Sequence, residues 1–249
     1  MQRLAGKKAV VTGGARGIGR GIAEGFAAEG ADVAIMDVAP ASAAGAVLKA
    51  LTAHGRRGLY LEADVSNEES VNNAIGEVIR EFGGVDVLVN NAGIVHEALV
   101  EDLDAKDWDR VLAVNLRGTF LCTRAVLPGM LKQGGGRIIN IASQLGQIGG
   151  STMAPYSASK AGVIGFTRAL AREVSDRHVL VNAIAPGPVE TAMLESESAD
   201  WKRKKLADLP IGRFASVAEI VPTAVFLASD ESTYYAGQTL GPNGGDVML

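Results

Sequence analysis

The stretch Thr12-Gly13-Gly14-Ala15-Arg16-Gly17-Ile18-Gly19 follows a short apolar run and precedes a segment of helical period that begins near Ile18. Glycines at such a turn let the backbone reverse sharply, and they let a diphosphate approach the amides at the helix N-terminus, where partial positive charge lies. The spacing departs from G-x-G-x-x-G, since three residues separate Gly13 from Gly17. The stretch indicates a dinucleotide-binding turn, and a glycine turn used only for packing is the alternative.

Outward from this turn, short β-branched runs alternate with longer segments of helical period, which is typical of a parallel sheet covered by helices. We expect an α/β, single-domain Rossmann fold over 1–249, with a doubly wound seven-stranded parallel sheet flanked by helices on both faces. The apolar periodicity fades only at about 190–209, and we expect a lid over the site there. The predicted strands are Lys8 to Val11, Asp32 to Met36, Gly58 to Glu62, Val85 to Val89, Arg137 to Ile141, Leu180 to Ile184 and Gln238 to Leu240.

Polar residues end several of these strands at the carboxyl edge, where open α/β sheets bind ligands. Asp37 ends the second strand about twenty residues after the glycine turn, where a carboxylate accepts hydrogen bonds from both ribose hydroxyls of the adenosine. A 2'-phosphate would meet a like charge there, so NAD is favoured over NADP. Arg16 weakens this preference because it can stack on adenine or meet a phosphate. A solvated strand end or a helix cap is the alternative for Asp37.

Tyr156 and Lys160 lie four residues apart at the start of a predicted helix that runs to Val174, so their side chains share one face. A phenol has a pKa near 10, and a cation within about 4 to 6 Å would lower it by one to three units toward a useful acid-base range. Ser143 follows the fifth strand and can hold a substrate oxygen near that phenol. Asn115 interrupts an apolar helical run and either satisfies a local carbonyl or serves the site. Alone, each residue also fits an ordinary structural role.

Taken together with Asn90-Asn91-Ala92-Gly93, Tyr156-Ser-Ala-Ser-Lys160 and Pro186-Gly187, these residues resemble the short-chain dehydrogenase/reductase family along nearly the whole chain. The resemblance implies that Tyr156 is the general acid/base, that Ser143 positions the substrate oxygen, and that Lys160 binds the nicotinamide ribose and lowers the tyrosine pKa. It implies further that Asn115 holds a water linking Lys160 to solvent.

The same resemblance implies the residues that contact the cofactor. Members of the family with this length are usually homotetramers, which we carry over as an expectation. The cofactor residues implied are Gly13, Arg16, Gly17, Ile18, Gly19, Asp37, Asp64, Val65, Asn91, Ala92, Gly93, Tyr156, Lys160, Pro186, Gly187, Val189 and Thr191.

The leading functional hypothesis is an NAD(H)-dependent oxidoreductase that interconverts a secondary alcohol and a ketone. The subgroup of 3-oxoacyl-acyl-carrier-protein reductases is suggested by Gly162 to Glu173 and by Asn243-Gly244-Gly245. Those enzymes generally use NADPH, which Asp37 disfavours, and Gln133 to Gly136 replaces basic residues that they often carry. NADPH-dependent reduction of a 3-oxoacyl thioester is therefore the alternative. A non-catalytic dinucleotide-binding sensor or scaffold is the rival from another class.

Net charge, residue content and the distribution of apolar runs indicate which partners and which compartment to expect. A formal net charge of -4 gives no general reason to bind nucleic acid or an anionic membrane, so we expect a small-molecule partner. The single cysteine, Cys122, is expected to be a buried inert thiol, and the three histidines lack metal-ligand spacing. Because no long apolar run or cleavage site follows Met1, a cytoplasmic enzyme is expected. The basic run Trp201 to Lys205 lies among acidic residues and is interpreted as a solvated face of the lid.

Overall fold

A computed structural model describes residues 2–195 and 198–248. Its centre is one parallel sheet in the order β3-β2-β1-β4-β5-β6-β7. This confirms the predicted fold class. The strands are β1 Lys8–Thr12, β2 Asp32–Asp37, β3 Gly58–Glu62, β4 Val87–Asn90, β5 Gly136–Ile141, β6 Val179–Ile184 and β7 Thr239–Leu240.

The fourth and seventh strands differ from the prediction. The sequence analysis started the fourth strand at Val85, whereas β4 begins at Val87. The backbone of Asp86 still bonds to Lys8 and Arg137, and its carboxylate also accepts the backbone N–H of Lys8. The seventh strand begins one residue later than predicted. Gln238 donates its N–H to the Asn182 side chain, although its carbonyl still accepts the N–H of Ala183 on β6. Both differences are confined to one or two residues at a strand start, where backbone hydrogen bonds continue beyond the assigned strand.

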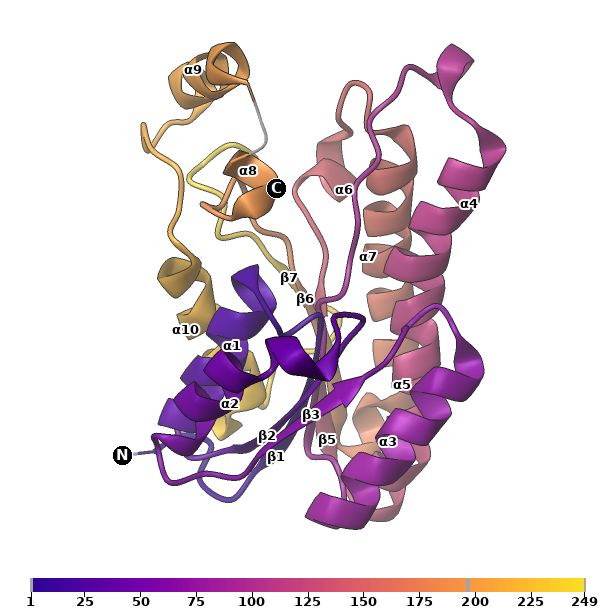
Figure 1. Ribbon diagram of the computed structural model, residues 1–249, viewed down its shortest axis with the longest axis vertical. Helices are drawn as coiled ribbons and strands as arrows, with labels where there is room; N and C mark the ends of the chain where they lie inside the picture. The colour runs from indigo at the N-terminus through magenta and orange to yellow at the C-terminus, as the bar shows by residue number, and fades with distance from the viewer. Residues whose placement is uncertain (1, 196–197, 249) are drawn as a thin grey trace.

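Two layers of helices cover the sheet, as Figure 1 shows. One face packs against α1 Gly17–Ala28, α2 Gly45–Thr52 and α10 Val217–Ala228, with Phe26 fully buried between them and the strands. The other face packs against α3 Glu68–Phe82, α5 Gly118–Lys132 and α7 Ala154–Val174. Burying apolar surface on both faces is the main driving force for this arrangement. The remaining helices are α4 Ala105–Leu112, α6 Leu145–Ile148, α8 Ala192–Glu195 and α9 Ala199–Asp208, with a π-helical segment at Ala113–Arg117.

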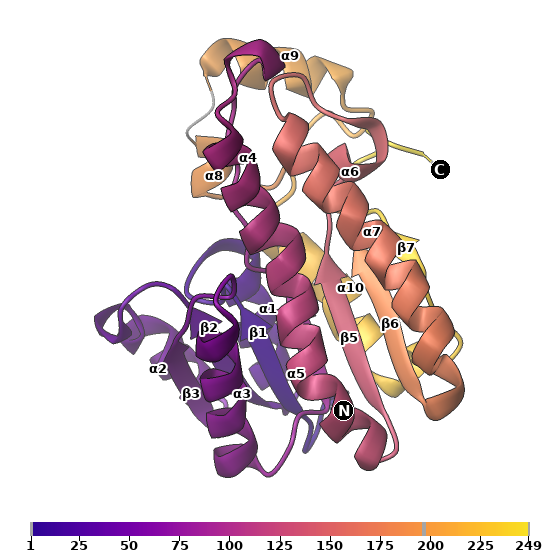
Figure 2. The same cartoon turned by 90° about the vertical axis from the view of Figure 1, so that its right-hand side faces the viewer.

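The strand order reverses between β1 and β4, which are neighbours in the sheet although two strands separate them in sequence. Loops leaving two such strands diverge to opposite faces, and this opens a crevice at the carboxyl edge. In Figures 1 and 2, α8 and α9 lie beyond that edge, and the start of α7 lies beside it. The predicted lid at 190–209 corresponds to this region, with 196–197 outside the described residues.

Cys122 is fully buried on α5, and burial raises the pKa of its thiol to about 12. The predicted burial of Cys122 is confirmed, and the raised pKa of its thiol disfavours the reactive thiolate. Over 2–195 and 198–248, no helix has both the length and the apolar character that a bilayer span requires. Within the same residues, no cluster of three acidic, histidine or cysteine side chains suits a metal ion.

Candidate active site

The glycine turn lies between β1 and α1, and two of its glycines adopt left-handed backbone angles. Gly13 has φ +62° and Gly17 has φ +56°, a region in which a side chain is strained. Arg16 precedes α1 without capping it by a side-chain hydrogen bond, and the first turn of α1 holds no acidic residue. The backbone amides at the start of α1 therefore remain available to an anion.

Asn91 braces this turn from β4. Its Nδ2 donates to the carbonyl oxygens of Thr12 and Gly13, each at 2.9 Å. A Cβ atom at Gly19 would lie only 2.3 Å from that same Nδ2, so only glycine fits there. The side chain of Asn91, expected near the cofactor ribose, is thus committed to holding the loop.

Thr12 is a site residue that the sequence analysis did not single out. Its buried Oγ1 accepts the backbone N–H groups of Asn91 and Ala92, each at 3.0 Å. This links the ends of β1 and β4 across the crevice. A hydroxyl at the end of an otherwise apolar buried strand was the available signal, because buried polar groups require partners.

Asp37 lies at the end of β2 against the glycine turn. Its carboxylate accepts the backbone N–H of Ala15 at 2.9 Å and that of Ala39 at 3.0 Å. The carboxylate is part-buried and held beside the turn. Neither the helix cap nor the free strand end considered as alternatives describes this arrangement.

The two residues expected beside adenine lie after β3. Asp64 accepts the backbone N–H and the hydroxyl of Ser66 on its carboxylate, and it makes no contact with the glycine turn among the described hydrogen bonds. Val65 is buried, and a Cβ at Gly118 would lie 2.9 Å from its Cγ2. Val65 therefore anchors α5 to this end of the sheet.

Asn115 lies in the π-helical segment, fully buried. Its side chain accepts the N–H of Ile94 at 2.8 Å and donates to the Ile94 carbonyl and the Ser159 hydroxyl. The amide thus satisfies local backbone and fixes the loop after β4 to the helix of Tyr156, and a role of Asn115 in the site itself stays a prediction. Single π-helical turns often occur at functional sites.

Lys160 and Ser143 flank Tyr156 at the start of α7. The Lys160 Nζ donates to the carbonyl oxygen of Ile141 at 2.7 Å and lies 5.6 Å from the centroid of the tyrosine ring. The Ser143 hydroxyl accepts the backbone N–H of Leu145 at 3.1 Å and lies near enough to the phenol to affect its pKa. Gly93 lies against both Lys160 and Asn115. A Cβ atom there would be 3.5 Å from the Lys160 Nζ and 3.4 Å from the Asn115 Oδ1. The structure thus brings all four predicted catalytic residues together.

Burial is the largest cause of the pKa shifts of Tyr156 and Lys160. It raises the pKa of Tyr156 above its ordinary value, an effect that the nearby Ser143 hydroxyl partly opposes. It also lowers the pKa of the Lys160 ammonium to about 8. Both shifts disfavour the charged forms, as expected for desolvated groups. The lowering of the phenol pKa by Lys160 stays a prediction.

We expect Lys160→Met to stabilise the fold while removing activity. A folded-state pKa of about 8 against 10.5 for the free side chain means that the parent binds fewer protons folded than unfolded between these values. Parent stability should therefore rise from about pH 8 to 10.5, and protonated, buried Lys160 should cost about 3 kcal/mol at pH 7. Urea unfolding at pH 7 and pH 10.5 should show the variant more stable at the lower pH and the difference shrinking at the higher one. A difference independent of pH would contradict the lowered pKa.

The segment after β6 forms the opposite wall. A Cβ at Gly187 would lie 2.8 Å from the Asn243 Cα, and the Pro186 carbonyl accepts the N–H of Gln144 at 3.1 Å. Val189 is buried, and the methyl group of Thr191 would lie 3.7 Å from a Cβ on Gly17. The segment predicted to contact the nicotinamide thus lies against the glycine turn.

The residues present fit a nicotinamide dinucleotide. The uncapped start of α1 with Gly17 and Ile18 would hold the diphosphate, and Asp37 would receive the adenosine ribose. The opposite wall from Pro186 to Thr191 and the ammonium of Lys160 would hold the nicotinamide end. Arg16 is exposed at the entrance, with no side-chain partner among the described residues.

Comparison with known proteins agrees with this geometry. A family model described as short chain dehydrogenase matches residues 7–202. A 3-oxoacyl-acyl-carrier-protein reductase of Staphylococcus epidermidis is 43% identical over 242 residues, which cover 97% of this chain and 99% of the relative. The reductase of the same name from Aquifex aeolicus is 42% identical, with 98% of each chain covered.

Solved structures give the same picture. A provisionally named short-chain alcohol dehydrogenase from Sinorhizobium meliloti has a TM-score of 0.94 at 37% identity and covers 97% of this chain and 96% of its own. A provisionally named gluconate dehydrogenase from Agrobacterium tumefaciens has a TM-score of 0.94 at 34% identity, with 99% and 98% covered.

Proposed function

The chain belongs to the short-chain dehydrogenase family, and from that premise we propose that it interconverts a ketone and a secondary alcohol. The observation that carries the proposal is the part-exposed Tyr156 between the buried Ser143 and Lys160, beside a turn built for a dinucleotide diphosphate. Nicotinamide dinucleotide, when bound, supplies or accepts the hydride.

The protein's own residues handle the proton. Ser143 and Tyr156 present two hydroxyls to the substrate oxygen, and the phenol donates its proton as the ketone is reduced or accepts one as the alcohol is oxidised. The desolvated ammonium of Lys160 lies close enough to stabilise the phenolate that results. Thr12 and Asn91 keep the glycine turn in place for the cofactor.

Two substrate classes compete within this reaction. The curated relatives carry the name of 3-oxoacyl-acyl-carrier-protein reductases, and this supports a 3-oxoacyl thioester better than the general secondary alcohol expected from the sequence. The structural neighbours named for alcohols and gluconate support the second class. For the cofactor we propose NAD(H), because the Asp37 carboxylate lies where a 2'-phosphate would be repelled.

A panel assay separates these candidates. Purified protein should be tested with NADH and NADPH against 3-oxoacyl thioesters and simple ketones, and with NAD and NADP against secondary alcohols and polyols. Turnover of any ketone supports the reaction class, and the ratio of kcat/KM values identifies the substrate class. A protein that binds NADH and reduces no member of the panel would favour the non-catalytic sensor.

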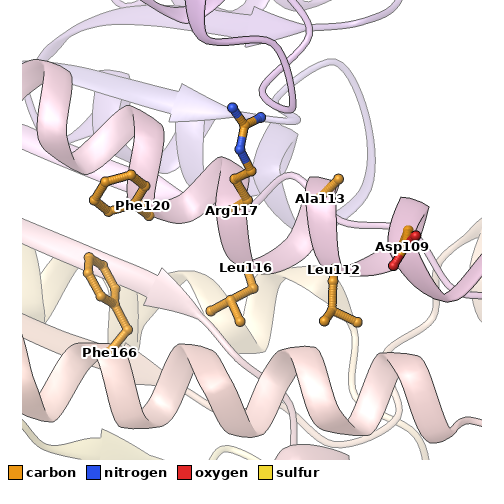
Figure 3. A pocket seen from close by; sticks show the side chains of 7 residues that line it. All are labelled: Asp109, Leu112, Ala113, Leu116, Arg117, Phe120 and Phe166. Atoms are coloured by element: carbon orange, nitrogen blue, oxygen red, sulfur yellow. The ribbon is translucent and has the colours of Figure 1, made fainter.

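We also propose that the protein is a homotetramer, as its family resemblance implied, with a small-molecule partner rather than nucleic acid or a membrane. The surface best suited to self-association is an apolar hollow of about 530 Å³ along α4, α5 and α7. Figure 3 shows Leu112, Leu116 and Phe120 pointing toward α7, and Phe166 facing Phe120, with ring centroids 6.4 Å apart.

Introducing a charge into this hollow should split the assembly. Phe120 is 42% exposed, and Ile79 on α3 is 41% exposed outside the hollow, so Phe120→Glu and Ile79→Glu form a matched pair. Light scattering should give four chains for the parent and for Ile79→Glu, and fewer for Phe120→Glu, because a buried carboxylate is costly at an interface. A parent that is monomeric would overturn the tetramer.

A further inference from the structure

Two side chains from distant parts of the sequence meet at the carboxylate of a third residue. Lys205 of α9 forms an ion pair with Asp246 near the C-terminus, and the Nε2 of Gln144 donates to the same carboxylate oxygen. The exposed fraction is 18% for the Lys205 side chain and 9% for that of Asp246. Gln144, next in sequence to Ser143, is buried as well.

Two neighbouring cations of α9 behave differently. Arg203 and Lys204 are both 75% exposed and pair with Asp200 of the same helix, so they tie α9 only to itself. Such exposed pairs are screened by salt and contribute little. The interpretation of Trp201 to Lys205 as a solvated face holds for Arg203 and Lys204 but is wrong for Lys205, which points inward because Asp246 lies beneath it.

The other attachments of α9 include a hydrogen bond from the Lys202 Nζ to the Glu195 carbonyl at 3.0 Å and the half-buried side chains of Trp201 and Leu206. None of the residues of α9 is fully buried in the described structure, although Leu209 immediately after it is. A surface helix is normally held by an apolar stripe, which α9 lacks. The ion pair of Lys205 with Asp246 is therefore a principal link between α9 and the body of the protein.

Asp246 is presented by a fixed turn. The Asn243 side chain accepts the N–H of Gly245 at 3.0 Å and donates to the Val247 carbonyl at 2.8 Å. The Gly244 carbonyl accepts the N–H of Ile211, which ties this turn to the segment after α9. The carboxylate is thus held in place before Lys205 or Gln144 reaches it.

Gln144 carries the link to the catalytic loop. Its backbone N–H donates to the carbonyl of Pro186, in the segment after β6 that is expected to hold the nicotinamide, and its side chain donates to Asp246. Its Oε1 is buried without a donor among the residues that the structure describes. A buried carbonyl without a partner is unfavourable, so the contact of Nε2 with the charged carboxylate must outweigh that cost.

We propose that Lys205, Asp246 and Gln144 form a latch that holds α9 over the crevice at the carboxyl edge of the sheet. The latch also fixes the loop of Ser143, so Asp246 is a positioning residue. The kinetic consequence rests on the proposed function, whereas the attachment of α9 does not. Removing the latch should leave α9 detached for a larger fraction of the time, and substrate binding should weaken accordingly.

Limited proteolysis tests the attachment without any activity assay. Trypsin should cut Asp246→Asn at Arg203 or Lys204 about tenfold faster than the parent, because α9 opens more often. Asp200→Asn is the matched control: it makes the same chemical change and releases the exposed pairs, and it should accelerate cleavage less than threefold. If Asp246→Asn folds poorly by circular dichroism, Lys205→Met replaces it, since both cleavage sites remain.

Kinetics test the positioning role once a ketone substrate is found. Asp246→Asn should raise the KM for the ketone about tenfold, with kcat within about threefold and NADH affinity unchanged. The double variant Lys205→Asp with Asp246→Lys restores the opposite charges, and the Gln144 amide can turn to present Oε1, so KM should return to within threefold of the parent.

The outcomes are separable. Equal cleavage of Asp246→Asn and Asp200→Asn would overturn the latch whether or not the protein reduces ketones. Faster cleavage with an unchanged KM would overturn the positioning role alone. Faster cleavage in a protein that reduces no ketone would leave the attachment standing and contradict the proposed function instead.

Discussion

Tyr156→Phe should reduce kcat by about 10³-fold or more while leaving the affinity for NADH within about twofold of the parent. The substitution removes one oxygen, the atom that exchanges a proton with the substrate. The ring keeps its volume, so the packing at the start of α7 and the position of Lys160 are preserved. Ser143 would still hydrogen-bond to the substrate oxygen but has no route for delivering the proton.

Two measurements make this prediction decisive. Fluorescence titration with NADH reports the cofactor site independently of turnover. Tyr234→Phe is the matched control, because Tyr234 is fully exposed and the same atom is lost there without consequence. If the Tyr156 variant kept a tenth of the parent activity, another group would have to move the proton.

Asp37→Asn should shift the preference from NAD toward NADP by about 10- to 100-fold in kcat/KM. The parent places a carboxylate against the glycine turn, and a 2'-phosphate brought to that position would meet a like charge in a part-buried setting, worth roughly 1–3 kcal/mol. Asparagine retains an oxygen to accept the N–H of Ala15 or Ala39, so the turn should stay in place.

The matched control is Asp64→Asn, at the end of the neighbouring strand. Its carboxylate bonds only to Ser66 among the described contacts, so any effect on adenine should fall equally on both cofactors and leave the ratio unchanged. A parent that already prefers NADPH would contradict the proposed role of Asp37 and strengthen the 3-oxoacyl-thioester reading.

The fold and the core of the site were predictable because their signals are local. Alternating apolar runs and helical period fix the sheet and its flanking helices, and a four-residue step from Tyr156 to Lys160 fixes their shared face. Carboxyl ends of parallel strands meet at one edge, so Asp37, Asn91 and Ser143 could be placed near one another without coordinates.

Other features depend on contacts that leave no local mark. The π-helical turn around Asn115 has no sequence period of its own, and the paired hydrogen bonds of Asn115 to Ile94 join segments far apart in the sequence. The bracing of the glycine turn by Asn91 requires knowing which atoms of β1 and β4 face each other. Lys205 and Asp246 meet only after the chain has wrapped around the sheet, so the inward cation was indistinguishable from its exposed neighbours.

Transfer of deuterium from cofactor to product tests the central claim most directly. Cofactor labelled with deuterium at C4 of the reduced nicotinamide, in each of the two stereochemical forms, is incubated with the parent and its ketone, and the product alcohol is analysed by mass spectrometry. One of the two labels should appear on the carbinol carbon, one deuterium for each molecule formed. Product that carries deuterium from neither form would contradict hydride transfer and the account built on it.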